Sequence, residues 1–269
     1  MTPSQYLARL VVFVLLLPLD AAANSVNVAV ASNMSHAISE IAKSFEREEG
    51  IRPRLSFGSS GNFTRQLIQG APFKVFLSAD EKYIDILRDN QVSMLESVTI
   101  ARGRIALFVP ARSSLTGLNN LSAVVRDLQH GNYSRIVIAN PEHAPYGIAA
   151  RQAMQTAGLW AIERQRLLLA ENAAQATQIS LSGNVDAGIV PLSHAMLPEL
   201  AGKGRVFPIP ETWHTPLTQH LLLLHGANDS ETRFYQFLKS DKALHILEQH
   251  GYVISSLTPK AGTDGLAGP

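Results

Sequence analysis

The run Phe57-Gly58-Ser59-Ser60-Gly61-Asn62 links two segments of different pattern, and the rest of the chain repeats this arrangement. Residues 53–57 alternate in polarity as a short β-strand does, whereas residues 63–69 have the spacing of an amphipathic helix. The first N–H groups of a helix have no acceptor inside it, and the helix dipole makes that end electropositive. The uncharged turn therefore fits either a simple N-cap made by Ser or Asn, or an anion-binding site.

Three further turns join a predicted strand to a predicted helix: Ser32-Asn33, Pro145-Tyr146-Gly147 and Asn172-Ala173, with Asn172 as an N-cap. Strands that alternate with helices indicate an α/β fold with parallel sheets and helices on both faces. In such sheets ligands bind at the carboxyl ends of the strands. The strand and helix pairs of these units are predicted at residues 25–31 and 34–48, 135–140 and 148–157, and 167–169 and 171–176.

Two of the four turns come from each half of the chain, so two lobes that face each other across a cleft would bring all four together. The β-like stretch 99–110 is expected to pass between the lobes, and residues 215–224 to return. We expect one lobe at 24–102 plus 217–257 and the other at 103–216. The remaining predicted elements are strands at 73–80 and 185–191 and helices at 81–90, 121–128 and 231–250.

The composition indicates a soluble globular protein. The 269 residues are 46% hydrophobic and 17% charged, and the formal net charge is +1. This charge, without any basic run, argues against nucleic-acid binding. The chain has no cysteine, so the fold must be held by its core rather than by disulfides.

The N-terminus reads as a secretory signal. Arg9 precedes the apolar run 10–17, and Ala21-Ala22-Ala23 follows, so residues 1–23 are expected to be cleaved. The apolar run is too short to span a bilayer comfortably. Because no cysteine could accept a lipid, we expect a free protein in a bacterial periplasm rather than a lipoprotein. Residues 258–269, rich in Gly, Pro and Ala, are expected to be a disordered tail.

The four turns contain no Arg, Lys or metal ligand. A shell of donors satisfies a fully ionised oxyanion, whereas a protonated one such as hydrogen phosphate also needs an acceptor. Glu171 is the one possible acceptor beside these turns. The turns therefore favour a fully ionised oxyanion.

Two other kinds of site were weighed. The nine histidines form no H-x-x-H or H-E-x-x-H group, so no metal site and no cofactor is expected. An exported serine hydrolase could use Ser59 or Ser60 as nucleophile, His143 as base and Asp80 as orienting carboxylate. That chemistry needs a G-x-S-x-G elbow, which Gly58-Ser59-Ser60-Gly61 does not provide. Asp80 is expected instead to cap the helix that begins at Glu81.

The chain resembles the periplasmic molybdate-binding proteins of ABC transporters, which belong to the type II periplasmic binding proteins. The likeness covers nearly the whole mature chain in the right order. It is carried by AVASN (29–33), FGSSGNFTRQL with GAP after it (57–72), FLSAD (76–80), NPEHAPYG (140–147), AENAAQA (170–176), SGNVDAGIVPLS (182–193) and a C-terminal helix that ends in GY.

The resemblance implies a two-lobed fold in which each lobe is a mostly parallel sheet flanked by helices, with the ligand cleft between the lobes. It implies a monomer that is not an enzyme, captures molybdate or tungstate by neutral hydrogen bonds and delivers the anion to a membrane permease. The same fold binding sulfate or another small oxyanion is the alternative. The implied ligand-binding residues are Ser32, Asn33, Ser59 or Ser60, Tyr146 and Ala173, supported by Gly61, Asn62, Pro145, Gly147 and Asn172.

Two positions depart from the family pattern. One branch of the family uses a Tyr after the GIV strand, where this chain has Pro191, so that role is not carried over. Lys74 stands where a small or acidic residue is expected, and it is interpreted as a solvated surface residue unless it lies near the cleft. Asn33 is expected either to donate its side-chain amide to the anion or to brace its turn.

Overall fold

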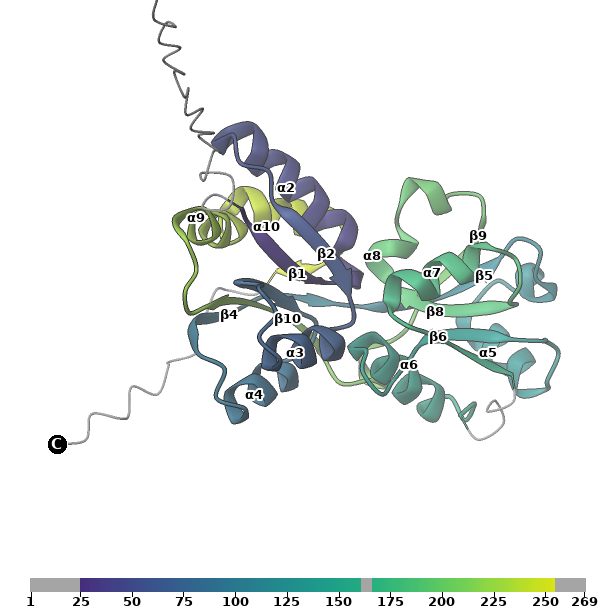
Figure 1. Ribbon diagram of the computed structural model, residues 1–269. Coiled ribbons are helices and arrows are strands. Elements are labelled where there is room, and N and C mark those ends of the chain that lie inside the picture. The colour runs from purple at the N-terminus through teal and green to yellow at the C-terminus, as the bar shows by residue number, and fades with distance from the viewer. Residues whose placement is uncertain (1–24, 161–165, 255–269) are drawn as a thin grey trace, which may run out of the picture.

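The protein is described here from a computed structural model, in which residues 25–160 and 166–254 are placed. They form two lobes, each with a β-sheet flanked by helices (Figure 1). The expected signal peptide, 1–23, and the expected tail, 258–269, lie outside the described residues. None of the helices in the two described ranges has the length and hydropathy that a bilayer span requires.

The first sheet has six strands in the order β11-β4-β10-β3-β1-β2. β1 runs parallel to β2 and β3, so the carboxyl ends of these three strands lie at one edge. β10 is antiparallel to β3 and β4, and β11 is antiparallel to β4. The strands are β1 (Asn27–Ala31), β2 (Arg54–Gly58), β3 (Val75–Ser78), β4 (Met94–Gly103), β10 (Leu217–Leu224) and β11 (Val253–Ile254).

The second sheet has five strands in the order β7-β6-β8-β5-β9. β6 is parallel to β7 and β8, whereas β5 is antiparallel to β8 and β9. Both sheets are therefore mixed, not mostly parallel, because β5 and β10 begin on the side between the lobes, where the parallel strands end. The strands are β5 (Ile105–Pro110), β6 (Ile136–Ala139), β7 (Leu167–Ala170), β8 (Ala187–Pro191) and β9 (Gly204–Pro208).

The chain passes between the two lobes where β4 gives way to β5. The two strands meet at Arg104 and belong to different sheets, so the stretch 99–110 does connect the lobes. β10 brings the chain back into the first sheet. The strands of the first sheet thus lie within 27–103 and 217–254, and those of the second within 105–208.

Short helices cover both sheets. In the first lobe Gly50 ends α2 in the left-handed conformation, at φ 67°, as expected of a C-cap glycine. The helices of the first lobe are η1 (Ser32–Met34), α2 (Ser35–Glu49), α3 (Ser60–Ile68), α4 (Lys82–Asp89), α9 (Asp229–Leu238) and α10 (Asp241–Gln249). Those of the second are η2 (Ser114–Gly117), α5 (Leu121–Gln129), α6 (Pro145–Thr156), α7 (Ala173–Leu181), α8 (Leu192–Ala195), η3 (Pro198–Leu200) and η4 (Glu211–Trp213).

The single helix predicted at 231–250 is wrong, because the segment forms two helices. Ser240 ends the first and begins the second: its side chain accepts a hydrogen bond from the Ala243 N–H and caps α10. α9 begins with a capping box, in which Asn228 and Glu231 satisfy each other's backbone N–H groups. Apolar spacing continues through the break, so the pattern alone does not reveal it.

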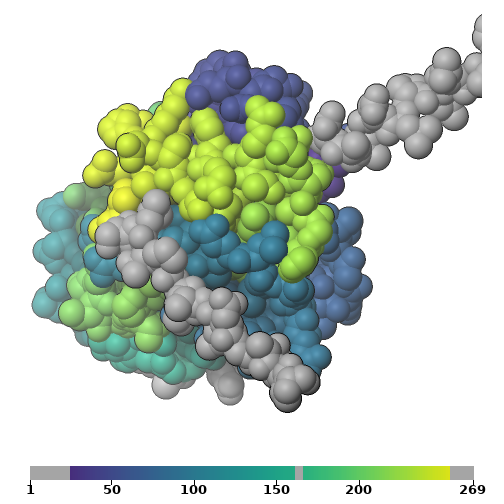
Figure 2. Space-filling view, turned by 90° about the vertical axis from the view of Figure 1, so that its left-hand side faces the viewer, coloured from purple at the N-terminus to yellow at the C-terminus, as the bar shows by residue number. Residues whose placement is uncertain are grey.

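The two C-terminal helices complete the first lobe by packing on α2. Figure 2 shows them (yellow-green) beside α2 (purple) on the outer face of that lobe. The ring of Phe45 on α2 meets the rings of Phe234 and Phe237, with centroids 5.0 and 5.3 Å apart. Helices α9 and α10 are therefore part of the core of the first lobe.

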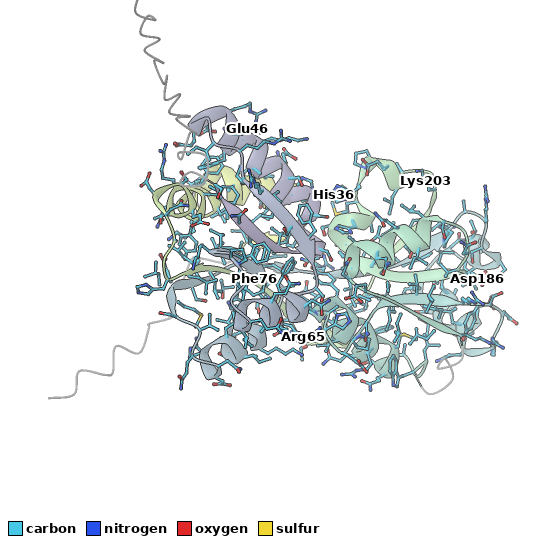
Figure 3. All side chains as sticks on the ribbon, in the orientation of Figure 1. His36, Glu46, Arg65, Phe76, Asp186 and Lys203 are labelled. Atoms are coloured by element: carbon cyan, nitrogen blue, oxygen red, sulfur yellow. The ribbon has the colours of Figure 1, made fainter. Side chains whose placement is uncertain are left out.

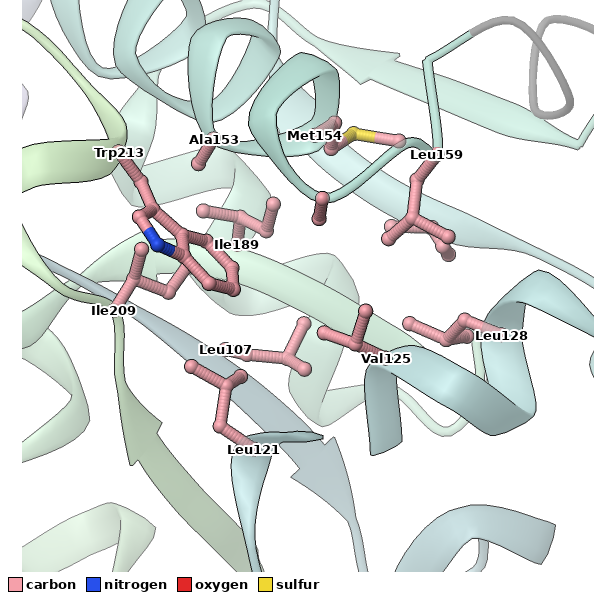
Figure 4. A pocket seen from close by; sticks show the side chains of 12 residues that line it. Leu107, Leu121, Val125, Leu128, Ala153, Met154, Leu159, Ile189, Ile209 and Trp213 are labelled. Carbon is pink, nitrogen blue, oxygen red and sulfur yellow. The ribbon is translucent and has the colours of Figure 1, made fainter. Parts of the chain in front are cut away.

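The second lobe contains an apolar cavity between its sheet and its helices α5 and α6 (Figure 4). Its volume is about 340 Å³, part of it open to solvent, and every side chain around it is hydrophobic. Such a lining offers almost no donors, so this cavity does not suit an anion. The lining residues are Leu107, Leu121, Val125, Leu128, Ile136, Ala153, Met154, Ala157, Leu159, Ile189, Ile209 and Trp213.

Candidate functional site

All four predicted turns lie between the lobes. In the first lobe, η1 follows β1 and α3 follows the neighbouring parallel strand β2. In the second lobe, α6 and α7 follow the neighbouring parallel strands β6 and β7. Two helix starts from each lobe therefore meet between the lobes. They lie at the carboxyl ends of parallel strands, where α/β sheets bind their ligands.

A small cavity of about 180 Å³, part of it open to solvent, lies where these helix starts meet. The six predicted ligand-binding residues all line it, and none of its lining residues is charged. Of the five predicted supporting residues, Pro145 lines the cavity, whereas Gly61, Asn62, Gly147 and Asn172 lie outside it. The lining consists of Ala31, Ser32, Asn33, Gly58, Ser59, Ser60, Ala144, Pro145, Tyr146 and Ala173.

The start of α3 leaves one backbone donor for the cavity. The Asn62 N–H donates to Ser59 Oγ at 3.3 Å, so Ser59 is the N-cap. The Gly61 N–H donates across the cleft to the His143 carbonyl oxygen at 3.0 Å. Among the described residues, the Ser60 N–H has no protein acceptor. The predicted N-cap is therefore present, and the Ser60 N–H is left for the cavity.

The start of α7 is organised in the same way. The Gln175 N–H donates to the Asn172 side chain at 3.1 Å, which confirms Asn172 as the N-cap. The Ala174 N–H donates to Ser32 Oγ in the other lobe at 3.3 Å. The N–H that is left without a described acceptor is that of Ala173.

At the start of α6 the remaining donor is the N–H of Tyr146. Pro145, the first residue of the helix, has no N–H. The N–H groups of the third and fourth residues, Gly147 and Ile148, both donate to the Ala144 carbonyl. Gly147 is required here because a Cβ at this position would lie 2.2 Å from the Ala139 carbonyl oxygen. The helix starts three residues earlier than predicted and lies close against β6.

Two serine hydroxyls are held so that their protons remain available. Ser60 Oγ accepts from the Ala79 N–H at 3.0 Å, and Ser32 Oγ accepts from Ala174 as described. A hydroxyl has one proton and two acceptor sites, so a hydroxyl that accepts from the backbone can still donate. Both side chains are buried, at 0% and 3% exposure. The cavity is thus lined by backbone and hydroxyl donors.

Asn33 braces the site instead of offering its amide to the cavity. Its Nδ2 donates to Gln219 Oε1 at 2.8 Å and to the hydroxyls of Tyr252 at 3.1 Å and Tyr146 at 3.3 Å. Its carbonyl accepts from Tyr252 at 2.7 Å and from Ser193 at 3.1 Å. This network, Asn33 with Gln219, Tyr252, Tyr146 and Ser193, joins both lobes behind the cavity.

Both tyrosines of this network are neutral hydroxyl donors. Burial raises the pKa of Tyr252 to about 12 and that of Tyr146 well above its usual value. The phenol of Tyr146 lies against Gly103, where a Cβ would come within 2.0 Å of the hydroxyl oxygen. Ser193 and Tyr252 stand in stretches that carry the family resemblance, whereas Gln219 does not. No role was predicted for any of the three, and their roles follow only from the fold.

His143 and Glu171 close the rim of the cleft. His143 Nδ1 lies 3.0 Å from Ser59 Oγ, and its Nε2 lies 3.7 Å from a Glu171 carboxylate oxygen. The other Glu171 oxygen accepts from the side chain of Asn62. Glu171 is half exposed and does not line the cavity, so it supplies no acceptor inside it.

The proposed hydrolase arrangement is only partly assembled. Ser59 and His143 are in contact, but the Asp80 side chain accepts from the N–H of Lys82, the first residue of α4, at 2.9 Å. Asp80 thus satisfies one N–H at the start of α4, although the N-cap residue itself is Glu81. Burial raises the pKa of Asp80. The carboxylate beside His143 is instead Glu171, at a distance too long for a hydrogen bond.

Lys74 and Pro191 lie outside the cavity. Lys74 precedes β3, at the end of the strand opposite to the site, and its Nζ donates to the His225 carbonyl oxygen at 3.0 Å. Pro191 ends β8 and is paired with Ile105 of β5. Asp186 lies at the sheet edge seen in Figure 3, where it accepts from the Ser134 N–H at 2.6 Å.

A wider groove beside the cavity shares Ser32 with it and runs between α2 and α7. On its floor the buried His194 contacts Thr177 at 3.1 Å through Nδ1 and Ser35 at 3.4 Å through Nε2. Burial lowers the pKa of His194 to about 3, so the ring is neutral. Within the described part of the chain, no three His, Asp or Glu side chains are grouped to hold a metal ion.

The sequence matches known families over most of its length. The family model described as "Bacterial extracellular solute-binding protein" matches residues 26–253. The molybdate-binding protein ModA of Rhodobacter capsulatus is 34% identical over 245 residues, which cover 88% of this chain and 91% of that protein. ModA of Azotobacter vinelandii is 32% identical over 240 residues, which cover 88% and 93%.

The comparison with solved structures also finds a molybdate-binding protein. The solved structure of the Azotobacter vinelandii periplasmic molybdate-binding protein superposes with a TM-score of 0.78 at 28% identity. The match covers 86% of this chain and all of that one. The expected two-lobed architecture of periplasmic binding proteins is therefore confirmed.

Proposed function

The chain belongs to the family of bacterial extracellular solute-binding proteins, which are transport proteins and not enzymes, and from this premise we propose that it captures molybdate. The observation that carries the proposal is the uncharged cavity that is lined by three helix starts and two serine hydroxyls. The proposed donors are the N–H groups of Ser60, Tyr146 and Ala173 and the hydroxyls of Ser32 and Ser60. Ser59 is the additional candidate, and Asn33 holds the turn in place.

The donor set suits a doubly charged oxyanion. Hydrogen bonds to an ionised acceptor are about twice as strong as neutral ones, and helix starts add positive partial charge. The cavity lining has no carboxylate that could accept a proton from the ligand. A protonated oxyanion such as hydrogen phosphate would therefore leave its own proton without an acceptor.

We propose tungstate as a second ligand, because it shares the charge and tetrahedral shape of molybdate. Sulfate, which is smaller, is the alternative ligand for the same donor set. The relatives with the highest identity given above are named for molybdate, and this favours the larger anion.

We also propose the steps around capture. The protein would be exported to the periplasm by cleavage of residues 1–23, remain free of lipid and act as a monomer. The lobes, at 24–102 with 217–257 and at 103–216, would close on the anion by hinge motion and present the closed form to the permease of an ABC transporter.

Calorimetric titration of the mature protein with molybdate, tungstate, sulfate and phosphate tests this assignment. Molybdate and tungstate should bind tightly, sulfate more weakly and phosphate not measurably. Sulfate binding as tight as molybdate binding would overturn the choice of ligand, and binding of none of the four would overturn the oxyanion assignment.

A further inference from the structure

We propose that His143 is a positioning residue for the Ser59 hydroxyl, and that protonation of its ring turns the Ser59 proton toward the bound oxyanion. The inference rests on the proposed function and adds a proton-dependent donor to it. It starts from the contact between Ser59 Oγ and His143 Nδ1, at 3.0 Å, which joins the two lobes at the wall of the cavity.

Glu171 selects the form of the neutral ring. His143 Nε2 faces the Glu171 carboxylate at 3.7 Å, so the proton of the neutral imidazole is favoured on Nε2. Nδ1 is then an acceptor, and the Ser59 hydroxyl donates its hydrogen bond to it. Since Ser59 Oγ already accepts from the Asn62 N–H, the hydroxyl has no proton left for the cavity.

A protonated ring reverses this hydrogen bond. Both ring nitrogens of an imidazolium are donors, so Nδ1–H donates to Ser59 Oγ. Ser59 then accepts from His143 and Asn62, and its own proton is free to donate into the cavity that it lines. The positive ring directly behind Ser59 also attracts a dianion.

The contacts that hold the ring in place are all at the rim of the cleft. The Gly61 N–H donates to the His143 carbonyl at 3.0 Å, and a Cβ on Gly61 would lie 3.0 Å from that of His143. The charged groups around His143 are Glu171, its chain neighbour Glu142, and Arg65, which donates to the side chain of Asn62. These contacts hold the backbone of His143 at the wall of the cavity, and the ring contacts Ser59 from there.

The consequence is a coupling between proton binding and anion binding. When the His143 ring is protonated, Ser59 becomes a donor and the affinity for molybdate rises. By reciprocity, molybdate binding draws a proton onto the protein. One additional hydrogen bond to a charged ligand corresponds to about 10- to 100-fold in the dissociation constant.

Calorimetric titration with molybdate at about pH 6 and pH 8, the range in which histidine changes charge, tests the coupling. Each titration is repeated in two buffers of different ionisation enthalpy, so that proton uptake is measured directly. The wild type should bind more tightly at the lower pH, with proton uptake. His143→Gln should show neither effect, and Ser59→Ala should keep only the smaller part due to charge.

Two further variants make the outcome specific. His245→Gln, at an exposed position on α10, should behave as the wild type does. Glu171→Gln removes the carboxylate that selects the neutral form, so its affinity at pH 8 should rise toward that at pH 6. Proton uptake that persists in folded His143→Gln would overturn the inference and leave the proposed function standing. A folded wild type that binds no molybdate at either pH would overturn both.

Discussion

At the scale of the residue, the serine hydroxyls of the cavity are oriented by the backbone groups from which they accept. Ser32 accepts from Ala174 of the other lobe, and Ser60 accepts from Ala79. A hydroxyl held in this way needs no reorganisation to donate, which lowers the cost of binding. The oxyanion would therefore meet donors that are already placed.

Ser60→Ala should weaken molybdate binding about 10- to 100-fold, because it removes a hydroxyl donor to a charged ligand, worth about 1.5–3 kcal/mol. Calorimetry measures the change. Ser182→Ala removes an exposed hydroxyl at the end of α7 that donates only to the Ile179 carbonyl, and it serves as the control. Equal affinities of the two variants would contradict a ligand role for Ser60.

Gly61→Ala should prevent full closure of the lobes. The added Cβ would lie 2.7 Å from the His143 carbonyl oxygen in the other lobe, so the contact between the lobes must open. Small-angle scattering should show less compaction on addition of molybdate than in the wild type, and the affinity should fall. Gly117→Ala, where a Cβ meets nothing within 4 Å, is the matched control. Normal compaction of Gly61→Ala would show that this contact does not limit closure.

At the scale of the element, side-chain N-caps mark where helices begin, and two of these caps have different consequences. Asn172 caps α7 and so places the Ala173 N–H at the cavity, whereas Ser240 caps α10 on the outer side of the first lobe. Each side chain accepts a hydrogen bond from the backbone N–H of the residue three positions further along the chain. Comparing variants of these two N-caps therefore distinguishes the effect of a cap on stability from its effect on ligand binding.

Asn172→Ala and Ser240→Ala should each lower the free energy of unfolding by about 1 kcal/mol, the usual value of a lost N-cap. Only Asn172→Ala should also weaken molybdate binding, because the start of α7 is no longer held. Chemical denaturation and calorimetry on the same two proteins measure the two effects. Loss of affinity in Ser240→Ala would argue against a local role for the cap of α7.

Elements with strong local signals were predicted from the sequence, and those set by tertiary contacts were not. The four turns were found because each has uncharged polar residues between a strand pattern and a helix pattern. The break at Ser240 was missed because apolar spacing continues on both sides of it. Gln219 and Ser193 were missed because they meet Asn33 only after segments 186 and 160 residues apart come together.

At the scale of the whole molecule, buried neutral histidines link stability to pH. Burial lowers the pKa of His220 to about 4, and the ring lies in β10 between Thr99 and Thr218. In the unfolded chain this histidine takes up a proton near its ordinary pKa of about 6.5. The unfolded state therefore binds more protons than the folded state between about pH 6.5 and 4.

The free energy of unfolding should fall as the pH is lowered through this window, with a slope of up to about 1.4 kcal/mol per pH unit for each such proton. His220→Gln should make the fall less steep, as measured by urea denaturation at several pH values. His130→Gln, at an exposed position, should leave the slope unchanged. An unchanged slope in folded His220→Gln would contradict this assignment.

The strand order of the first sheet has a consequence for how the protein is made. β10 lies between β3 and β4, so the sheet begun at residue 27 has a gap until residue 224 is available. A nascent chain therefore cannot finish its first lobe while it is still emerging from the ribosome. If the chain is exported as proposed, it would meet the export channel before this sheet can be complete, in a state that can still pass through a narrow pore.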